Sequence, residues 1–381
     1  MRIAGWLGLL AGVVALAACE SAPPVTAGGS GGAGGSGGAS TTASSTSSSS
    51  GGGGTTAAPC NAGGPMVCNP YGVDLEVPPL SGDAYWKVVS ETLKVPFYAP
   101  GPIYLGAGGT CDRCVAAIQH GRRLVLRVHA GSGPGPASLP KDLSMYRALL
   151  GELLDTYAAA VAVVVVEEGA DTPGAWSGSA GEYLTLLGAA CEVAHKKATA
   201  CTDGGLASTT MVFLLADYEI QSGNPSGALK MVTLAGDNPE VVAAFAAWPP
   251  ATVEDVKTAI AGQKTRMDAA RQLLAGVRGA GVDYANFRWY ERDQDSLDQS
   301  IALVRSQTGC NAVATTDMGQ RTQDVYEAQH KADDAKELGM SLVIWSSRAE
   351  SGAALLVDQN GNLTPNGTAL ATLSTNAVCG D

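Results

Sequence analysis

The stretch Ala162-Val-Val-Val-Val166, followed directly by Glu167-Glu168, decides the fold. All five of its residues are apolar and four are β-branched, which is typical of a parallel strand buried on both faces. The two carboxylates end this apolar run abruptly. Because functional groups gather at the C-terminal ends of parallel strands, we expect this junction to lie at a site.

Apolar runs and helical periodicity alternate on both sides of this strand. The other strands are predicted at 73–77, within 95–105, and at 123–129, 210–215, 283–290, 311–316 and 341–345. Helices are predicted at 83–93, 111–120, 144–158, 181–198, 253–277, 296–306, 323–338 and 365–373. An irregular insertion separates residue 215 from residue 250.

Eight strand–helix units predict an α/β protein that closes as a (β/α)₈ TIM barrel. The alternative is an open, doubly wound sheet that binds a dinucleotide. That fold places a G-x-G-x-x-G turn after its first strand, and none follows residue 77. The nearest imitation, Gly106-Ala-Gly108-Gly109, lacks the third glycine at the required spacing, so we interpret it as a loop and expect no cofactor.

Composition limits the partners of the chain. Its 381 residues carry 24 Lys and Arg against 36 Asp and Glu, a net charge of −12, and no basic stripe is available to neutralise phosphates. We therefore expect no nucleic-acid partner. About 320 residues remain after the N-terminal tract, enough for one barrel, and we expect a monomer.

The N-terminus is predicted to be a secretory signal followed by a flexible linker. Arg2 precedes an apolar run that ends in Leu16-Ala17-Ala18-Cys19, so residues 1–18 are predicted to be a secretory signal. The last four residues resemble a bacterial lipobox, which implies a lipid on Cys19; the alternative is ordinary cleavage beside an incidental cysteine. Residues 19–59 are rich in Gly, Ser and Thr and are predicted to form a disordered linker. Residues 60–381 are predicted to form the barrel. We expect a membrane-anchored lipoprotein of the cell envelope, at the outer membrane or cell surface.

Cysteine counting fits an oxidising compartment. Nine cysteines minus Cys19 leave eight, an even number that allows four disulfides. Sequence proximity favours the pairs Cys60–Cys68, Cys111–Cys114, Cys191–Cys201 and Cys310–Cys379, among 105 connectivities. A metal site is not expected, because no second CxxC or histidine pair accompanies Cys111-Asp-Arg-Cys114.

Polar residues follow several predicted strands. Glu167 and Glu168 end the fourth strand and Asp317 follows the seventh. Carboxylates that face each other across a barrel mouth suit glycoside hydrolysis, in which one protonates the leaving oxygen and the other attacks or activates water. The residues expected to contact a sugar are His129, Arg288, Tyr290 and Trp345, the last as an indole wall.

At these positions the sequence resembles the (β/α)₈ retaining glycoside hydrolases of clan A. The likeness is carried by Val163-Val-Val-Val-Glu-Glu168, Asn286-Phe-Arg-Trp-Tyr290 and Thr315-Thr-Asp-Met-Gly-Gln320, with Val343-Ile-Trp345 behind them. It implies that Glu168 is the acid/base and that position 317 holds the nucleophile. The chain departs from the family pattern in having Glu167 where Asn is expected, Arg288 where His is common, and Asp317 in place of Glu, which implies a degenerate site.

Two functions therefore stay open at this stage. One is a surface-anchored glycoside hydrolase that acts on an extracellular poly- or oligosaccharide, with Glu168 and Asp317 as its carboxyl pair and Glu167 beside them. The other is a catalytically inactive barrel lipoprotein that binds carbohydrate or serves a structural role.

Overall fold

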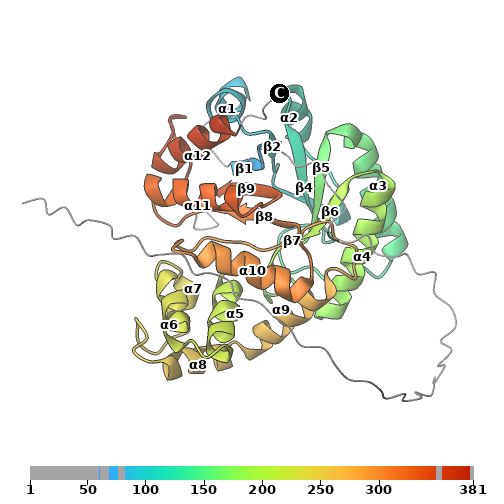
Figure 1. Ribbon diagram of the computed structural model, residues 1–381. Coiled ribbons are helices and arrows are strands. Elements are labelled where there is room, and N and C mark those ends of the chain that lie inside the picture. Colours follow the sequence, from blue (N-terminus) through green and yellow to red (C-terminus); the bar gives the residue numbers. More distant parts are fainter. Residues whose placement is uncertain (1–59, 61–67, 76–81, 349–353, 378–381) are drawn as a thin grey trace, which may run out of the picture. The chain divides into compact units, whose positions relative to one another are not determined.

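The computed structural model describes Cys60 and residues 68–75, 82–348 and 354–377. Strands and helices alternate along this part of the chain, and the strands form a parallel sheet that curls into a nearly closed barrel with helices around it (Figure 1). The predicted (β/α)₈ barrel is confirmed. Among the described helices, none combines the length and the apolar character needed to cross a bilayer.

Eight strands line the barrel in the order β6-β5-β4-β2-β1-β9-β8-β7, and β3 pairs with β4 outside this path. Their bounds are β1 Tyr71–Leu75, β2 Phe97–Tyr98, β3 Pro102–Tyr104, β4 Arg123–His129, β5 Val161–Val166, β6 Ala200–Asp203, β7 Ala285–Asn286, β8 Val313–Met318 and β9 Leu342–Ser347. The first and last strands of this order meet through single parallel bridges, Thr202 with Tyr284 and Leu206 with Phe287. These bridges complete the ring.

Helices follow most strands and cover the outside of the barrel (Figure 1). Their bounds are α1 Gly82–Lys87, α2 Cys114–Gln119, α3 Leu143–Tyr157, α4 Ala180–Lys196, α5 Ser208–Gln221, α6 Pro225–Leu234, α7 Pro239–Ala243, α8 Val253–Gly262, α9 Lys264–Gly276, α10 Ser296–Thr308, α11 Val325–Glu337 and α12 Pro365–Asn376. Helix α4 begins with a capping box, in which Ser179 and Glu182 satisfy each other's backbone N–H groups.

Two apolar cores separate the inside of the barrel from its helical layer. The smaller core takes all its buried members from strands or residues directly beside them, among them Val163 and Val165 of β5, so it fills the barrel. The larger core joins strand residues such as Val164 and Val166 to helix residues. Alternation along β5 therefore places every second side chain inside the barrel.

The predicted strand at 210–215 is wrong, because this stretch lies in helix α5. Residues 208–216 of α5 are all buried, and a short apolar run that is buried on all sides has the same pattern in a helix as in a strand. The strand at this place in the barrel is β6, Ala200–Asp203, whose sequence Ala-Cys-Thr-Asp lacks an apolar signal. The barrel has the eight strands that the sequence predicts, with one of them at a different place in the chain.

Three smaller expectations also need correction. The predicted helix at 253–277 is two helices, α8 and α9, which meet at Gln263. The predicted strand at 283–290 is reduced to the two residues of β7. The insertion before residue 250 contains α6 and α7, and each of these begins with an asparagine cap followed by proline.

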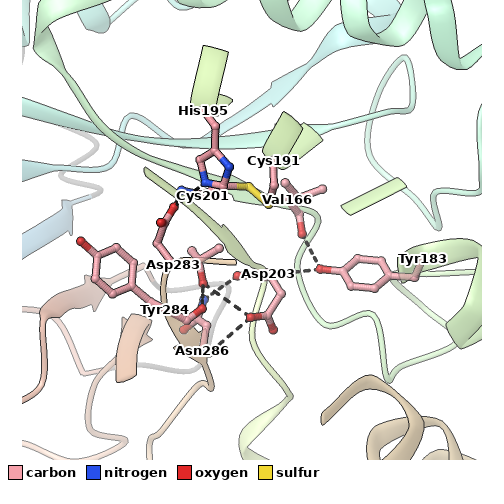
Figure 2. Close-up of a disulfide and its surroundings, with 11 residues drawn as sticks. Val166, Tyr183, Cys191, His195, Cys201, Asp203, Asp283, Tyr284 and Asn286 are labelled. Carbon is pink, nitrogen blue, oxygen red and sulfur yellow. Dashed lines mark hydrogen bonds and ion pairs between the residues drawn. A yellow bond between two sulfur atoms is a disulfide. The ribbon is translucent and has the colours of Figure 1, made fainter. Parts of the chain in front are cut away.

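A disulfide between Cys191 of α4 and Cys201 of β6 supports the point where the barrel closes (Figure 2). Beside it, Asp283 accepts a 2.8 Å hydrogen bond from the backbone N–H of Cys201 and lies 2.9 Å from Nε2 of His195. One residue further along β6, the hydroxyl of Thr202 donates to the carbonyl of Tyr284. These contacts hold β6 to the segment that leads into β7.

Two of the four predicted disulfides are present and two are wrong. Cys111–Cys114 and Cys191–Cys201 form as predicted. Cys60 pairs with Cys310, 250 residues away, so the predicted pairs Cys60–Cys68 and Cys310–Cys379 cannot form. The carbonyl of Cys60 accepts a bond from Ala312, which places residue 60 beside the start of β8; the fold, not sequence proximity, sets the pairing. Cys68 is also disulfide-bonded, and Cys19 and Cys379 lie outside the described residues.

Candidate active site

Two cavities open where the C-terminal ends of the strands meet. The first, of about 320 Å³, is lined by Asp74, Pro102, Tyr104, Arg127, His129, Glu168, Arg288, Asp317, Ser346 and Arg348. The second, of about 620 Å³, is lined by Thr172, Pro173, Gly174, Ala207, Ser208, Thr209, Asn238, Pro239, Glu240, Arg266, Arg288, Tyr290, Asp317 and Arg321. Because Arg288 and Asp317 line both, the two cavities adjoin at these residues.

Arg127 of β4 is the centre of the first cavity. The residue is 1% exposed, and its guanidinium forms an ion pair with Asp74 of β1 and donates a 2.6 Å hydrogen bond to the carbonyl of Thr316 on β8. Contacts to two other strands of the barrel, β1 and β8, fix the orientation of the guanidinium. Arg127 therefore supplies a positioned positive charge below the carboxyl groups.

Glu168 follows β5, lines the first cavity and forms an ion pair with Arg127. Its Oε1 lies 3.0 Å from Nε of Arg127, and its side chain is 21% exposed. Burial alone would raise the pKa of this carboxyl group. The charges of Arg127 and Arg288, with smaller contributions from His129 and Arg348, outweigh burial and hold the pKa of Glu168 below its ordinary value. Glu168 is therefore ionised at neutral pH.

Asp317 lies on β8 where the register against β9 shifts between Thr315 and Met318. Such an irregularity re-aims a side chain, and here it brings Asp317 to the cavities. The hydroxyl of Tyr290 donates to its Oδ1, and its Oδ2 lies 3.9 Å from Nη1 of Arg288. A tyrosine donor and a neighbouring guanidinium therefore flank the carboxyl group.

Burial is the main reason that the pKa of Asp317 lies above its ordinary value. Arg127 and Arg288 oppose this rise without cancelling it, and the negative charge of Glu168 adds to it. The pKa values of Glu168 and Asp317 are thus displaced in opposite directions. The two carboxyl groups divide into one that is ionised and one that holds a proton more firmly.

Glu167 does not line either cavity. It is 1% exposed, and its two carboxylate oxygens bond with Nδ1 of His129 at 2.8 Å and the backbone N–H of Ala130 at 2.6 Å. Its backbone is left-handed, with φ 51°. Glu167 therefore supports His129, which lines the first cavity, and the turn at its backbone allows the next residue, Glu168, to face the cavity.

Trp345, like Glu167, is an expected site residue that lines neither cavity. It is 1% exposed, belongs to the core between strands and helices, and lines neither cavity. The expected indole wall is therefore wrong, because the alternation along β9 points Ser346, not Trp345, to the cavity. His129, Arg288 and Tyr290 do line the cavities as expected.

Several residues that line the cavities are not among those expected from the sequence, chiefly Asp74, Arg127, Arg266, Arg321 and Arg348. One of them, Arg127, could have been recognised from the sequence. Arg127 interrupts an otherwise apolar part of β4, two residues before His129, and a charge inside a buried strand is rare unless it has a partner. The other four lie at strand ends, in loops or on a helix face, where charged residues are common.

Among the described residues one group, Asp293, His330 and Asp334, has ligand atoms close enough to hold a metal ion, within 4.8 Å of one another. None of the three lines either cavity. Nδ1 of His330 lies 3.3 Å and 3.2 Å from Oδ2 of Asp293 and Asp334, so ion pairs within the group already engage the imidazole.

Comparisons with known proteins bear on the fold. No protein-family model and no curated protein matches the sequence. A glucosidase from Croceicoccus marinus has a similar structure, with a TM-score of 0.52 and 10% identity over 82% of this chain and 68% of that protein. At this identity the similarity shows the barrel fold alone.

Further solved structures are similar at lower scores. A GH128 (subgroup II) endo-β-1,3-glucanase from Sorangium cellulosum has a TM-score of 0.49 and 14% identity, covering 80% of this chain and 98% of its own. A GH128 (subgroup I) endo-β-1,3-glucanase from Amycolatopsis mediterranei, solved in complex with laminarihexaose, has a TM-score of 0.45 and 12% identity over 80% and 99%.

Proposed function

We propose that this chain is a glycoside hydrolase that cleaves O-glycosidic bonds of an extracellular poly- or oligosaccharide. One observation carries the proposal: the carboxyl groups of Glu168, after β5, and Asp317, on β8, line the same cavity at the C-terminal mouth of a barrel, and their pKa values are displaced in opposite directions. A carboxylic acid beside a carboxylate is the pair that glycosidic cleavage requires.

The electrostatics favour an assignment of roles opposite to the one implied by the family resemblance. Of the two groups, Asp317, whose pKa is raised by burial, holds a proton more firmly and is the better donor to the departing glycosidic oxygen. Glu168, held ionised beside Arg127, is the group that can attack the anomeric carbon or deprotonate a water. Tyr290, which donates to Asp317, would orient the acid.

The arginines at the site also favour a second candidate function, because they weaken the nucleophile. Nε of Arg127 lies 3.0 Å from Glu168, and a carboxylate engaged in an ion pair is a weaker nucleophile than a free one. A barrel that binds carbohydrate without cleaving it is the function this contact favours. Binding without turnover would identify it.

Activity assays on the purified protein test the proposal. We expect turnover of at least one member of a panel of aryl glycosides by the wild type. Loss of one carboxyl group, in Glu168→Gln or Asp317→Asn, should lower kcat/KM by about 10²–10⁴-fold. Glu254→Gln, which removes an exposed carboxylate on α8, is the matched control and should keep the wild-type rate. Equal rates for all four proteins would reject both residues.

We also propose that the hydrolase is anchored to the cell envelope by lipid on Cys19. The support is the Leu-Ala-Ala-Cys segment behind an apolar run, with a Gly/Ser/Thr tract after it. Two or more acyl chains give stable anchoring, and the tract would let the barrel reach glycans some distance away.

A further inference from the structure

The positively charged residues that line the two cavities differ in type from those in the rest of the chain. Of 24 Lys and Arg residues, five line the cavities, and all five are arginine: Arg127, Arg266, Arg288, Arg321 and Arg348. A guanidinium matches the two oxygens of a carboxylate or sulfate with parallel N–H donors, whereas an ammonium is a point charge. This selection of arginine occurs in a chain whose net charge is −12.

Three of these arginines face the second cavity from different elements. Arg266 lies on α9, Arg288 follows β7 and Arg321 follows β8. Their side chains are 14%, 22% and 16% exposed, so each guanidinium is largely withdrawn from water while part of it faces the cavity. Positive charges that converge from three elements form a concave site for an anion.

The chain leaves much of this donor capacity unused. Within the part of the chain that the structure describes, the guanidinium groups of Arg288 and Arg321 donate no hydrogen bond, and their ion-pair distances to Asp317 and Glu291 are 3.9 Å and 3.7 Å. Arg321 instead lies over the ring of Tyr290. Largely buried guanidinium groups without acceptors are rare unless a ligand supplies them.

The carboxylates near these arginines either accept hydrogen bonds from other residues or are exposed to water. Glu291, behind Arg321, is 2% exposed and accepts 2.7 Å hydrogen bonds from Ser208 and Asn238. Arg266 donates to Glu240 at 3.0 Å and lies 3.6 Å from Oδ2 of the buried Asp171. The side chain of Glu240 is 63% exposed, so the pair between Arg266 and Glu240 can open toward a ligand. An incoming anion would therefore meet guanidinium groups that are positioned but not saturated.

We propose that the second cavity binds an acidic sugar residue, so that the substrate is a glycan bearing carboxylate or sulfate groups. This inference rests on the proposed function, because the cavity meets the catalytic one at Arg288 and Asp317. A cavity of about 620 Å³ has room for a sugar unit on the far side of the cleaved bond. The anionic group of that unit would lie between Arg266 and Arg321.

Calorimetric titration with matched sugars tests the inference. The probes are trigalacturonate, the same trimer with its carboxyl groups reduced to alcohols, and a sulfated galactose trimer with its desulfated form. We expect wild type to bind at least one anionic probe tenfold or more tightly than its neutral counterpart at low salt, with the preference shrinking as salt rises. Carboxylate and sulfate recognition are told apart by which anionic probe is preferred.

Variants locate the preference. Arg266→Gln and Arg321→Gln should each reduce it about tenfold, and Arg266→Gln carries the test if Arg321→Gln does not fold. Arg271→Gln is the matched control, because Arg271 lies on the same helix as Arg266, pairs with Asp217, and lines neither cavity. A preference that survives both cavity variants overturns the inference.

Other outcomes separate this inference from the proposed function. Equal or weaker binding of both anionic probes overturns the inference, even if neutral aryl glycosides are cleaved through Glu168 and Asp317, in which case the hydrolase proposal stands. Tight, arginine-dependent binding of an acidic trimer without turnover of any glycoside keeps the acidic-sugar site and rejects the hydrolase.

Discussion

Glu167 links backbone conformation to the geometry of the site. A left-handed backbone at a residue other than glycine costs on the order of 1–3 kcal/mol and persists only where surrounding contacts hold it. Here the contacts are the bonds from its carboxylate to His129 and Ala130. The turn at Glu167 also presents Glu168 to the cavity, so one buried carboxylate organises two cavity residues.

Substitution of this residue should show both effects. Glu167→Gln replaces one acceptor oxygen by an N–H₂ group that faces a donor, so we expect a loss of about 1–3 kcal/mol in the free energy of unfolding. Turnover should fall as well, because Glu168 and His129 lose their support. Urea unfolding and kcat/KM are the measurements, with the exposed Glu152→Gln on α3 as control. An unchanged midpoint and an unchanged rate would contradict this role.

The positions of the carboxyl groups at the barrel mouth are predictable from the sequence, but the orientations of their side chains are not. Strand ends can be located from apolar runs, which is why Glu168, Asp317 and His129 were expected at the mouth. Whether Glu167 or Glu168 faces the cavity depends on one φ angle, and whether Trp345 or Ser346 does depends on the strand register. Neither quantity is encoded in a pattern of residue types.

Strand β6 is held by polar contacts in addition to the packing of Cys201 in the core, and its short sequence has no run of apolar residues that could predict it. Asn286 of β7 donates a 2.7 Å hydrogen bond to the carbonyl of Asp203, and the backbone N–H of Asn286 donates to Oδ1 of Asp203 (Figure 2). At Gly204 an added Cβ would lie 1.3 Å from the carbonyl oxygen of Glu167, so only glycine fits there. Helix α5, with its run of buried residues, gave the stronger apolar signal.

Asp203 should make stability depend on pH. Burial raises its pKa to about 7, well above the usual range for an aspartate, so the folded protein binds this proton more tightly than the unfolded chain. The stability it contributes is therefore present at low pH and is lost as pH rises from about 4 to about 7. At 1.36 kcal/mol per pKa unit the loss is at most about 4 kcal/mol.

The comparison of wild type with Asp203→Asn isolates this effect, because the amide does not titrate. The difference in unfolding free energy between the two proteins should shift against wild type as pH rises through this range and stay level above pH 7. The exposed Asp298→Asn is the control. A difference that is constant from pH 4 to 7 would contradict the raised pKa of Asp203.

Two disulfides form a matched pair for measuring what cross-links contribute. Cys60–Cys310 and Cys191–Cys201 are equally buried, but they close loops of 250 and 10 residues. By the chain-entropy relation, replacing both cysteines by serine should cost about 5.5 kcal/mol for the longer loop and about 2.7 kcal/mol for the shorter. Guanidinium unfolding of the two double variants gives the comparison. Equal losses would show that contacts in the folded state, not loop entropy, dominate.

For the whole molecule, the eightfold alternation of strands and helices was sufficient to predict the barrel, even with one strand misplaced. The long-range disulfide and the arginine-lined cavities were not predictable, because both depend on residues that are far apart in sequence and meet only after the barrel closes. The chain is acidic overall, and nothing in its composition indicates a cluster of guanidinium groups at the mouth.

The N-terminal tract makes a prediction for the protein in the cell. Cys19→Ser should move the chain from the membrane fraction to the soluble fraction, because the acyl chains of the mature protein would be lost. Fractionation with detection of the barrel by antibody measures this, and Ser21→Ala, in the same segment, controls for changes near the cleavage site. Membrane association that is unaffected by Cys19→Ser would rule out this anchor.

The dependence of kcat/KM on the leaving group tests the central claim most directly. If Asp317 is the acid and Glu168 the ionised partner, Asp317→Asn should lose about 10²–10⁴-fold on glycosides of weakly acidic phenols but retain most of its rate on dinitrophenyl glycosides, which leave without a proton. Glu168→Gln should be slow on both kinds of substrate, because the ionised partner is needed whatever the leaving group. No turnover by wild type, or a Glu168→Gln variant that alone keeps its rate on dinitrophenyl glycosides, would contradict the assignment.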